Sequence, residues 1–377
     1  MDAHTAVKTP ETECTRISLC FLHLSTVPDP DYEAPVHEVY RKFFLAHARS
    51  YPNLRVYGSS FPRDSSLGPI PSWIPDLACP IRALEYGEAA YQTCHNALPS
   101  STGESLQLHG IKVAEVVTIH KSVSLNTSDE VVLARCVSWE PVDLSSGQYR
   151  DKSPLLEAFM EAILAGQTLD WLPDCPTAKE VGEEYLQYRQ SPDELSPIFF
   201  HRLMSYLPGR AFFDASGGYF GICPASIMVG DLIWVVLGYS FPLLLRPTPS
   251  EGSFQLIGEC YVPGLMRGEG LSGLFPLSAS SGEKWSMTYD LTNFGPLYTH
   301  GTKKTQIDPR LPPLPPDWVM RFKIREEVFL SEFNAEGERG VMIFYNEKEE
   351  KLQWEDPRLA PQSLQARGVA IQEFNII

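Results

Sequence analysis

Few residue groups in this chain have the types and spacing that chemistry requires. Residues 268–273 read Gly-Glu-Gly-Leu-Ser-Gly and match the pattern G-x-G-x-x-G. That pattern binds dinucleotides only where it follows a strand and opens a helix. The surrounding sequence, MRGEGLSGLFPLS, is typical of a loop. We therefore expect a turn at this position and no cofactor.

The other candidates for catalysis or metal binding are incomplete. His37-Glu38 begins the zinc motif H-E-x-x-H, but Arg41 stands where the second histidine is required. Cys94 and His95 are adjacent, so their side chains point apart and form no dyad. The chain has no G-x-S-x-G motif and no Walker lysine. We predict no catalytic residue, no metal ligand and no cofactor, and expect that the protein is not an enzyme.

Charged residues near the apolar segments have simpler structural roles. Asp214 and Asp231 stand in turn-rich sequence, where aspartate is favoured. Asp231 is expected to accept backbone N–H groups and to set the start of the buried strand 232–237. Arg246 and Glu269 flank apolar strands, and we predict an ion pair between them.

Composition limits the class of protein. The chain has 377 residues, of which 43% are hydrophobic and 21% charged, so it is globular and long enough for two to three domains. Its formal net charge of −16 repels phosphate backbones, and no basic stripe compensates for it. We therefore expect no nucleic-acid partner. Prolines cluster at 309–316, as in a linker.

The N-terminal sequence and the cysteines indicate a cytoplasmic protein with reduced thiols. The first residues lack a basic region, and the apolar run 17–24 is too short for a secretion signal or a membrane span. No Cys-x-x-Cys pair occurs. The eight cysteines are Cys14, Cys20, Cys79, Cys94, Cys136, Cys175, Cys223 and Cys260.

Hydrophobic periodicity predicts helices in the first two thirds of the chain, with some strands between them. Helical spacing marks three segments: 31–48, 153–166 and 191–206. Residues 71–77, PSWIPDL, should be extended, with Trp73 packed on a neighbouring face. Strands are expected at 131–139 and, as two strands around Gly110, at 104–120.

The segment from Arg210 to Leu271 predicts a β-rich module, because short apolar runs alternate with glycine and proline breaks. Its order is distinctive: Arg-x-Phe-Phe, Gly-Tyr-Phe-Gly-Ile-Cys-Pro, Gly-Asp, Pro-x-x-Leu-Arg and a closing Gly-Glu-Cys-Tyr-Val-x-Gly-x-Met-x-Gly-Glu. This order resembles the C-terminal region of fungal heterokaryon-incompatibility (HET) proteins. The pairing of the first helix with Pro-Ser-Trp-Ile-Pro-Asp is similar to the same family.

The resemblance implies a role in fungal self/non-self recognition and programmed cell death. In that family the signature domain would precede Asp31 by well over a hundred residues. The chain therefore resembles the downstream half of a HET protein, which is either naturally short or the product of a truncated gene model. No activity of the signature domain is carried over, since no residues here match it.

Residues 306–360 resemble a WW domain, a small antiparallel sheet that binds proline-rich peptides. The resemblance implies a structural clasp between Trp318 and Pro357 and a peptide-binding groove made of Phe344 and Trp354. A purely structural β-meander is the alternative explanation. Asp308-Pro309-Arg310-Leu311 is also echoed by Asp356-Pro357-Arg358-Leu359, although the chain shows no convincing longer repeat.

Together these patterns predict an α+β fold. A helical middle segment packs with a barrel- or sandwich-like β module, and a WW-like antiparallel β-meander follows. The expected divisions are an N-terminal extension (1–30), a mixed α/β region (31–150), a helical segment (151–208), the β-rich module (209–305), the WW-like module (306–360) and a C-terminal tail (361–377).

The function expected from these features is that of a non-catalytic regulatory or interaction protein with a protein partner. One alternative is an adaptor that binds proline-rich peptides through the WW-like module. Another is an accessory protein of a fungal gene cluster.

Overall fold

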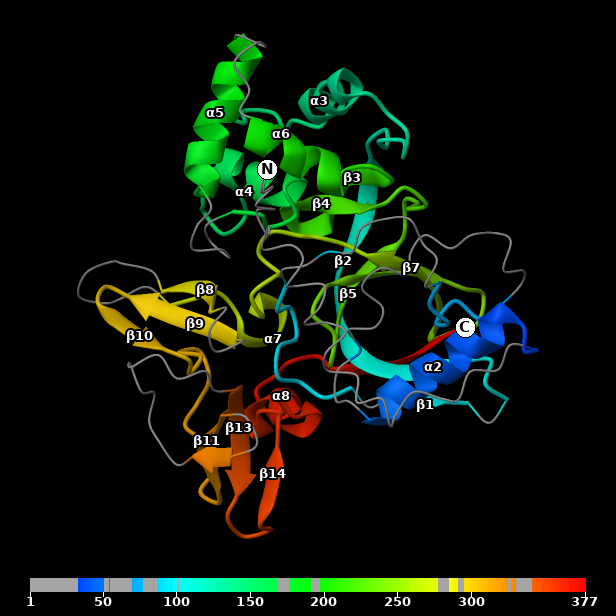
Figure 1. Ribbon diagram of the computed structural model, residues 1–377, viewed down its shortest axis with the longest axis vertical. Helices are drawn as coiled ribbons and strands as arrows, with labels where there is room; N and C mark the ends of the chain where they lie inside the picture. Colours follow the sequence, from blue (N-terminus) through cyan, green and yellow to red (C-terminus); the bar gives the residue numbers. More distant parts are fainter. Residues whose placement is uncertain are drawn as a thin grey trace, which may run out of the picture.

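The computed structural model describes residues 33–50, 54, 70–76, 84, 87–95, 97–100, 102–168, 176–190, 197–276, 285–290, 295–324, 327–329 and 341–377. The predicted N-terminal extension, 1–30, lies outside these residues. The fold is α+β, as the sequence predicted. Helices gather at one end, strands form the centre, and two small sheets lie at the other end (Figure 1).

Helices α3 to α6 form the helical end, and α2 lies away from them, in the lower part of the molecule in Figure 1. The helix bounds are α2 Val36–Ser50, α3 Asp129–Ser138, α4 Leu155–Ile163, α5 Ala178–Gln190, α6 Pro197–Tyr206, α7 Glu269–Ser272 and α8 Pro361–Ala366. The central strands are β1 Leu98–Pro99, β2 Leu106–Ile119, β3 Arg210–Ala215, β4 Tyr219–Pro224, β5 Leu232–Val236, β6 Leu243–Pro247, β7 Ser253–Glu259 and β15 Gln372–Ile376.

The central strands close into a barrel. β5, β6 and β7 form an antiparallel meander, β2 pairs with β5, and β15 pairs with both β2 and β7. This gives a closed five-stranded ring. A second ring shares β2, β5, β6 and β7 but runs through β3 and β4, and it closes at a single bridge between Ile222 and Tyr261.

Strand β2 serves both rings because it is long and strongly bent. Along its length it pairs first with β15, then with β5 and finally with β3, with register shifts at 112–114 and 116–118. Such bulges increase the bend of a strand. A Cβ atom at Gly110 would lie 2.5 Å from the Val235 carbonyl oxygen, so only glycine lets β5 approach. The sequence suggested two strands around Gly110, whereas the structure has one.

Apolar side chains on both faces of β5 and β6 account for their continuous hydrophobic sequences. Ile233 and Leu244 point into the core between these strands and β3–β4. Trp234 and Leu243 point to the opposite face, into the largest core. There Trp234 packs on Phe374 of β15, with ring centroids 4.6 Å apart.

Two sequence predictions are wrong for physical reasons. Residues 131–139 form helix α3, because the buried side chains at Val132, Cys136 and Trp139 follow a helical period despite the β-branched residues. Residues 361–377 are no tail. They form α8 and β15, and β15 pairs with β2 on one side and with β7 on the other.

The predicted helices are confirmed where they are described, whereas residues 71–74, which were expected to be extended, form a turn closed by the hydrogen bond from the Ile74 N–H to the Pro71 carbonyl at 3.2 Å. α2, α4 and α6 fall within 31–48, 153–166 and 191–206 to within two residues, although 191–196 lie outside the described residues. Trp73 is fully buried and packs on Phe44 of α2, with ring centroids 5.6 Å apart.

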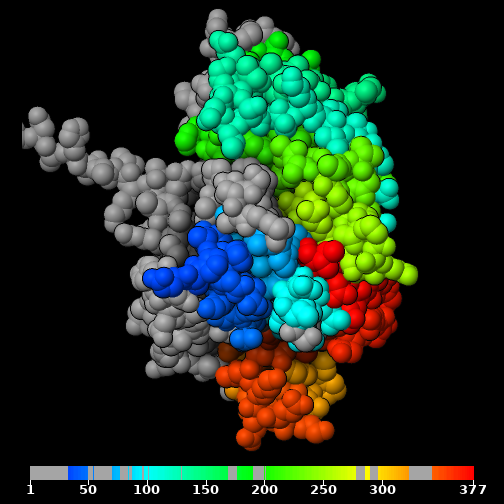
Figure 2. All heavy atoms as spheres, turned by 90° about the vertical axis from the view of Figure 1, so that its right-hand side faces the viewer, coloured from blue at the N-terminus to red at the C-terminus, as the bar shows by residue number. Residues whose placement is uncertain are grey.

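Two small antiparallel sheets follow the barrel. The first has the order β10-β9-β8 and the second β12-β11-β13-β14. Their strands are β8 Ser286–Asp290, β9 Gly295–His300, β10 Lys303–Thr305, β11 Trp318–Ile324, β12 Glu327–Phe329, β13 Val341–Asn346 and β14 Lys351–Gln353. The second sheet is antiparallel, as expected, but it is not a simple meander, because β12 and β13 pair with opposite edges of β11. Its module protrudes from the body in Figure 2.

Candidate functional site

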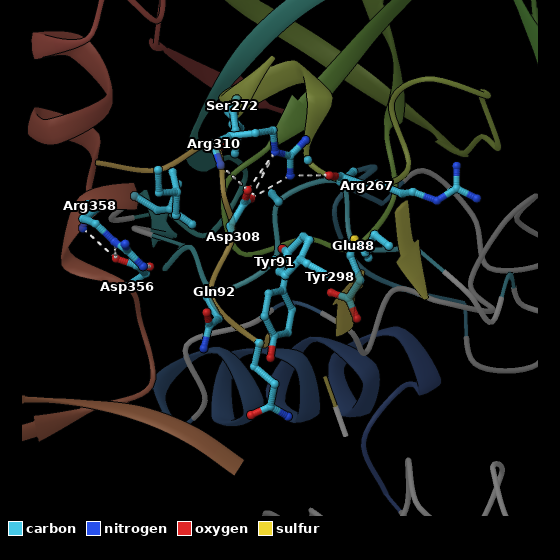
Figure 3. A pocket seen from close by; sticks show the side chains of 18 of the residues that line it. Glu88, Tyr91, Gln92, Arg267, Ser272, Tyr298, Asp308, Arg310, Asp356 and Arg358 are labelled. Atoms are coloured by element: carbon cyan, nitrogen blue, oxygen red, sulfur yellow. Dashed lines mark hydrogen bonds and ion pairs between the residues drawn. The ribbon is translucent and has the colours of Figure 1, made fainter. Parts of the chain in front are cut away.

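The two Asp-Pro-Arg-Leu sequences lie at one cavity between the barrel and the small sheets. Asp308 and Arg310 come from the chain that leads out of β10, whereas Asp356 and Arg358 follow β14. Figure 3 shows both pairs on the cavity wall, together with Arg267, Gln92 and Tyr298. The short repeat is thus brought together in space by the fold.

Each of the two sequences folds into the same turn. Asp308 Oδ1 accepts the backbone N–H of Arg310 at 2.9 Å, and the Asp308 carbonyl accepts that of Leu311 at 3.2 Å. Aspartate favours this local bond, and proline in the next position presets the backbone. Asp356 makes the matching bonds to Arg358 N at 2.9 Å and Leu359 N at 2.9 Å.

In each turn the arginine folds back onto its own aspartate. Arg310 donates from Nε to Asp308 Oδ1 at 2.9 Å and from Nη2 to Oδ2 at 2.7 Å. Arg358 donates to Asp356 in the same way, at 2.9 and 2.6 Å. The arginine side chains are 4% and 5% exposed, so both bidentate pairs are removed from water.

The remaining guanidinium donors join distant segments. Arg310 donates to the carbonyls of Arg267 at 2.7 Å and Gly273 at 2.9 Å, and its guanidinium stacks over Phe275 at 4.0 Å. A Cβ atom at Gly268 would lie 3.2 Å from Arg310 Nη2, and its φ of +77° also favours glycine. Gly268 therefore lets the arginine reach the barrel.

Arg358 completes the connection on the other side, since its Nη1 donates to the Pro312 carbonyl at 2.9 Å. The backbone N–H of Asp356 donates to the Gln92 carbonyl at 3.0 Å. We call these two ion-paired turns, 308–311 and 356–359, the arginine clamp. The clamp ties the residues on both sides of α7, the proline-rich linker and the end of the second small sheet to one another.

The cavity beside the clamp is small and polar. Its volume is about 30 Å³, enough for one or two water molecules. Gln306 is buried on its wall, and Gln306 Oε1 accepts no hydrogen bond among the described residues. Burial, reinforced by the nearby Asp308 carboxylate, raises the pKa of Tyr298. The site can hold ordered water, and its carboxylates at 308 and 356 are occupied by arginine.

The structure corrects the predicted peptide-binding groove. Phe344 is 0% exposed, so its ring cannot contribute to an open surface. Trp354 is half-buried because Tyr91 packs edge-on against it, with ring centroids 5.6 Å apart. The chain's own segment around Tyr91 therefore covers the tryptophan that was expected to bind proline.

The two residues of the predicted clasp lie in different settings. Trp318 is half-buried at the start of β11, opposite Asn346 in the register of the sheet. Pro357 is buried in the turn of the arginine clamp. The clasp between them stays a prediction, whereas the role of Pro357 in shaping the clamp is visible.

The other candidate residues are structural. Asp231 is confirmed as a turn residue, since its Oδ2 accepts the Met228 N–H at 2.7 Å. The predicted pair of Arg246 with Glu269 is wrong: Arg246 pairs with Asp231 at 2.8 Å, and Glu269 accepts the Arg267 N–H at 2.7 Å. Asp231 is closer because β5 and β6 are paired neighbours.

The residues of the incomplete motifs make local contacts in the fold. Glu38 binds Arg41 at 2.8 Å on α2, and this hydrogen bond lowers the pKa of Glu38. Residues 269–272 form the single helical turn α7, preceded by Gly268, and not the start of a βαβ unit. Among the residues that the structure describes, no group of three or more His, Cys, Asp or Glu side chains could hold a metal ion.

The length and apolar character of the helices show whether any of them could cross a membrane. No helix in the described part of the chain has the length and apolar character that a membrane crossing needs.

Sequence reasoning missed the arginine clamp although its signal was present. The repeated Asp-Pro-Arg-Leu was seen, but four residues are too few to indicate a shared site. Only the fold shows that the two sequences lie at the same cavity.

Comparison with known proteins agrees with the motifs. Residues 151–272 match the family model of the Het-6 beta-barrel domain, which confirms the resemblance to HET proteins. A stretch of 104 residues is 29% identical to heterokaryon incompatibility protein 6, OR allele, of Neurospora crassa. This match covers 26% of the chain and 15% of that relative. No solved structure matches the chain significantly.

Proposed function

We propose, starting from the match of residues 151–272 to the Het-6 beta-barrel domain, that this chain acts in fungal incompatibility as a non-catalytic regulatory protein. The named relative is a heterokaryon incompatibility protein, and it is 29% identical to this chain over 104 residues. In this proposal the barrel and its attached modules form a scaffold that a protein partner recognises. The chain transforms no substrate.

The observation that carries the non-catalytic part is the pairing of charges at the cavity. A general acid or base must be free to exchange a proton with a substrate held within hydrogen-bond reach. Here the carboxylates of Asp308 and Asp356 are each held by two or more bonds from arginine. The cavity beside them admits water and little else. Such an arrangement favours rigidity over reaction.

A heterokaryon assay with cavity variants tests this function. The full chain would be expressed in a fungal strain, and cell death would be scored by uptake of a membrane-impermeant dye after fusion with tester strains. We expect the chain to change the frequency of dead fusion cells. Gln306→Leu and Ser272→Ala, which alter the cavity wall while sparing the clamp, should leave this frequency unchanged.

The outcomes separate scaffold from enzyme. Loss of the phenotype in both cavity variants, at unchanged protein level and thermal stability, would contradict a non-catalytic role. Absence of any phenotype for the full chain in every tester strain would contradict the role in incompatibility.

Peptide binding is tested by fluorescence of Trp354. Because Tyr91 covers this ring, proline-rich peptides should leave the tryptophan emission of the full chain unchanged. Tyr91→Ala uncovers Trp354 and serves as the matched variant. A saturable change in the unmodified chain would restore the adaptor hypothesis.

A further inference from the structure

Two buried cysteines oppose each other at the seam of the second barrel ring. Ile222 and Tyr261 exchange both backbone hydrogen bonds, at 3.1 Å from Ile222 N and 2.9 Å from Tyr261 N. In an antiparallel pair the neighbours of such residues face each other without hydrogen bonds, and their Cα atoms lie about 4.5 Å apart. On one side of the bridge these neighbours are Cys223 and Cys260.

The two side chains enter the same core. Both cysteines are 0% exposed and belong to the cluster between β3–β4 and β5–β6. Each thiol now donates weakly to a carbonyl oxygen, from Cys223 to Ala211 at 3.6 Å and from Cys260 to Pro242 at 3.4 Å. Both are free cysteines. Rotation about Cα–Cβ would turn each sulfur toward the other.

We propose that Cys223 and Cys260 form a cross-strand disulfide when the protein meets a two-electron oxidant such as hydrogen peroxide, and that this bond staples the barrel seam. The Cα separation of a non-hydrogen-bonded pair lies at the lower end of the range, about 4.4–6.8 Å, that a disulfide spans. The seam is the weakest part of the ring, since a single bridge closes it among the described residues.

The chemistry balances with peroxide as the only co-reactant. The thiolate of Cys223 attacks one peroxide oxygen, the O–O bond breaks, and water leaves after protonation, so Cys223 becomes a sulfenic acid. The sulfur of Cys260 then displaces the sulfenic oxygen as a second water, and the S–S bond forms. Two thiols and one peroxide give one disulfide and two water molecules.

The surroundings of the two thiols limit when the oxidation can occur. Burial raises the pKa of both thiols, which slows oxidation while the seam is closed. At Cys223 the nearby Cys260 and Asp231 add to this rise in pKa and the charge of Arg210 opposes it, whereas at Cys260 the charge of Glu259 adds to it. The two thiols can exchange roles in the scheme, and the disulfide and the two water molecules produced are the same.

Peptide mapping of the full chain tests the bond. Reduced protein would be treated with hydrogen peroxide, alkylated and digested after glutamate, so that cleavage at Glu251 and Glu259 separates the two cysteines. We expect a linked pair of peptides that contain residues 223 and 260 and that part again on reduction. Cys136, which is also fully buried, is the internal control. It should remain a free thiol after peroxide treatment and become alkylated once the protein is unfolded.

Thermal unfolding supplies the second readout. The disulfide should raise Tm by about 5 °C, because the cross-link reduces the conformational entropy of the unfolded chain. Peroxide should leave the Tm of the double variant Cys223→Ala/Cys260→Ala unchanged. In Cys260→Ala, where the second thiol is absent, dimedone should trap a sulfenic acid at Cys223.

Three results would overturn the proposal. The first is that both thiols remain reduced in folded, peroxide-treated protein. The second is that either residue is linked to a different cysteine. The third is that the two residues are linked but Tm is unchanged.

Discussion

Arg310 and Arg358 each satisfy a buried aspartate two residues earlier and then reach a backbone carbonyl on another segment. A planar guanidinium can do both because its five N–H groups point in fixed directions. Lysine would supply one compact charge and could not keep the bidentate geometry. The clamp therefore depends on the planar, multiple-donor geometry of arginine and not on its positive charge alone.

Arg310→Met should lower the free energy of unfolding by about 3–5 kcal/mol, because it leaves the Asp308 carboxylate buried without its partner. Urea unfolding followed by circular dichroism measures this change. Lys179→Met is the matched control, since Lys179 and Glu183 form an exposed pair and its loss should change stability by roughly 0.5 kcal/mol or less. Equal effects of the two substitutions would contradict the importance of the clamp.

Glu259 should make stability depend on pH. Burial raises the pKa of this carboxyl from 4.5 to about 7, while the hydrogen bond from Tyr239 and the charge of Arg210 oppose the rise. The folded state thus favours the protonated form. The stabilisation is complete below pH 4.5 and is lost as the pH rises through about 7.

Glu259→Gln removes this titration. Relative to wild type, the variant should gain on the order of 3 kcal/mol between pH 4.5 and pH 8, from the shift of the pKa. Urea unfolding of both proteins across this pH range measures the difference. Parallel pH profiles for the two proteins would show that Glu259 does not titrate in this range.

Strand β15 decides the architecture at the scale of elements. It lies more than a hundred residues after β7 in sequence but pairs with β7 on one side and β2 on the other. Its alternate side chains explain the arrangement, since Phe374 and Ile376 are buried while Glu373 is exposed. The last residues are thus a structural strand of the barrel.

Phe374→Ala should destabilise the protein by about 3–5 kcal/mol, because it removes a ring that packs on Trp234 and Phe254. Glu373→Ala on the same strand is the matched control and should cost less than about 1 kcal/mol. The midpoint of urea unfolding reports both. If the two substitutions had similar effects, β15 would not be an integral part of the core.

At the scale of the whole molecule, the family match and the folding unit differ. The match covers 151–272, which includes β3 to β7 but neither β2 nor β15. In a fragment limited to these residues, β5 would lack its partner β2, and β7 would lack its partner β15. The barrel of this chain therefore needs residues from both sides of the matched region.

A fragment of residues 151–272 should fail to fold by itself, since unpaired β5 and β7 would expose their edges and apolar faces. We expect a circular-dichroism spectrum without a cooperative thermal transition, while the full chain melts cooperatively. Adding a separate fragment of residues 102–124, which contains β2, should not restore the transition without β15. A cooperative transition in the 151–272 fragment alone would contradict this requirement.

Local patterns were reliable where neighbours in sequence are neighbours in space. The helical stripe of α4, the turn at Asp231 and the apolar runs of β5 and β6 were predictable, because period, turn chemistry and burial on both faces are local properties. The order of motifs from Arg210 to Leu271 also indicated the HET resemblance. These features follow from residue types and short spacings alone.

Tertiary structure decided which distant segments meet. The alternation of polar and apolar residues in 372–376 fits a strand, but its partners lie far away in the chain, and only the fold pairs β15 with β2 and β7. The burial of Phe344, the covering of Trp354 by Tyr91 and the convergence of the two Asp-Pro-Arg-Leu turns have the same origin. Contacts between residues far apart in the chain depend on the closed sheet, whose shape no short window of sequence contains.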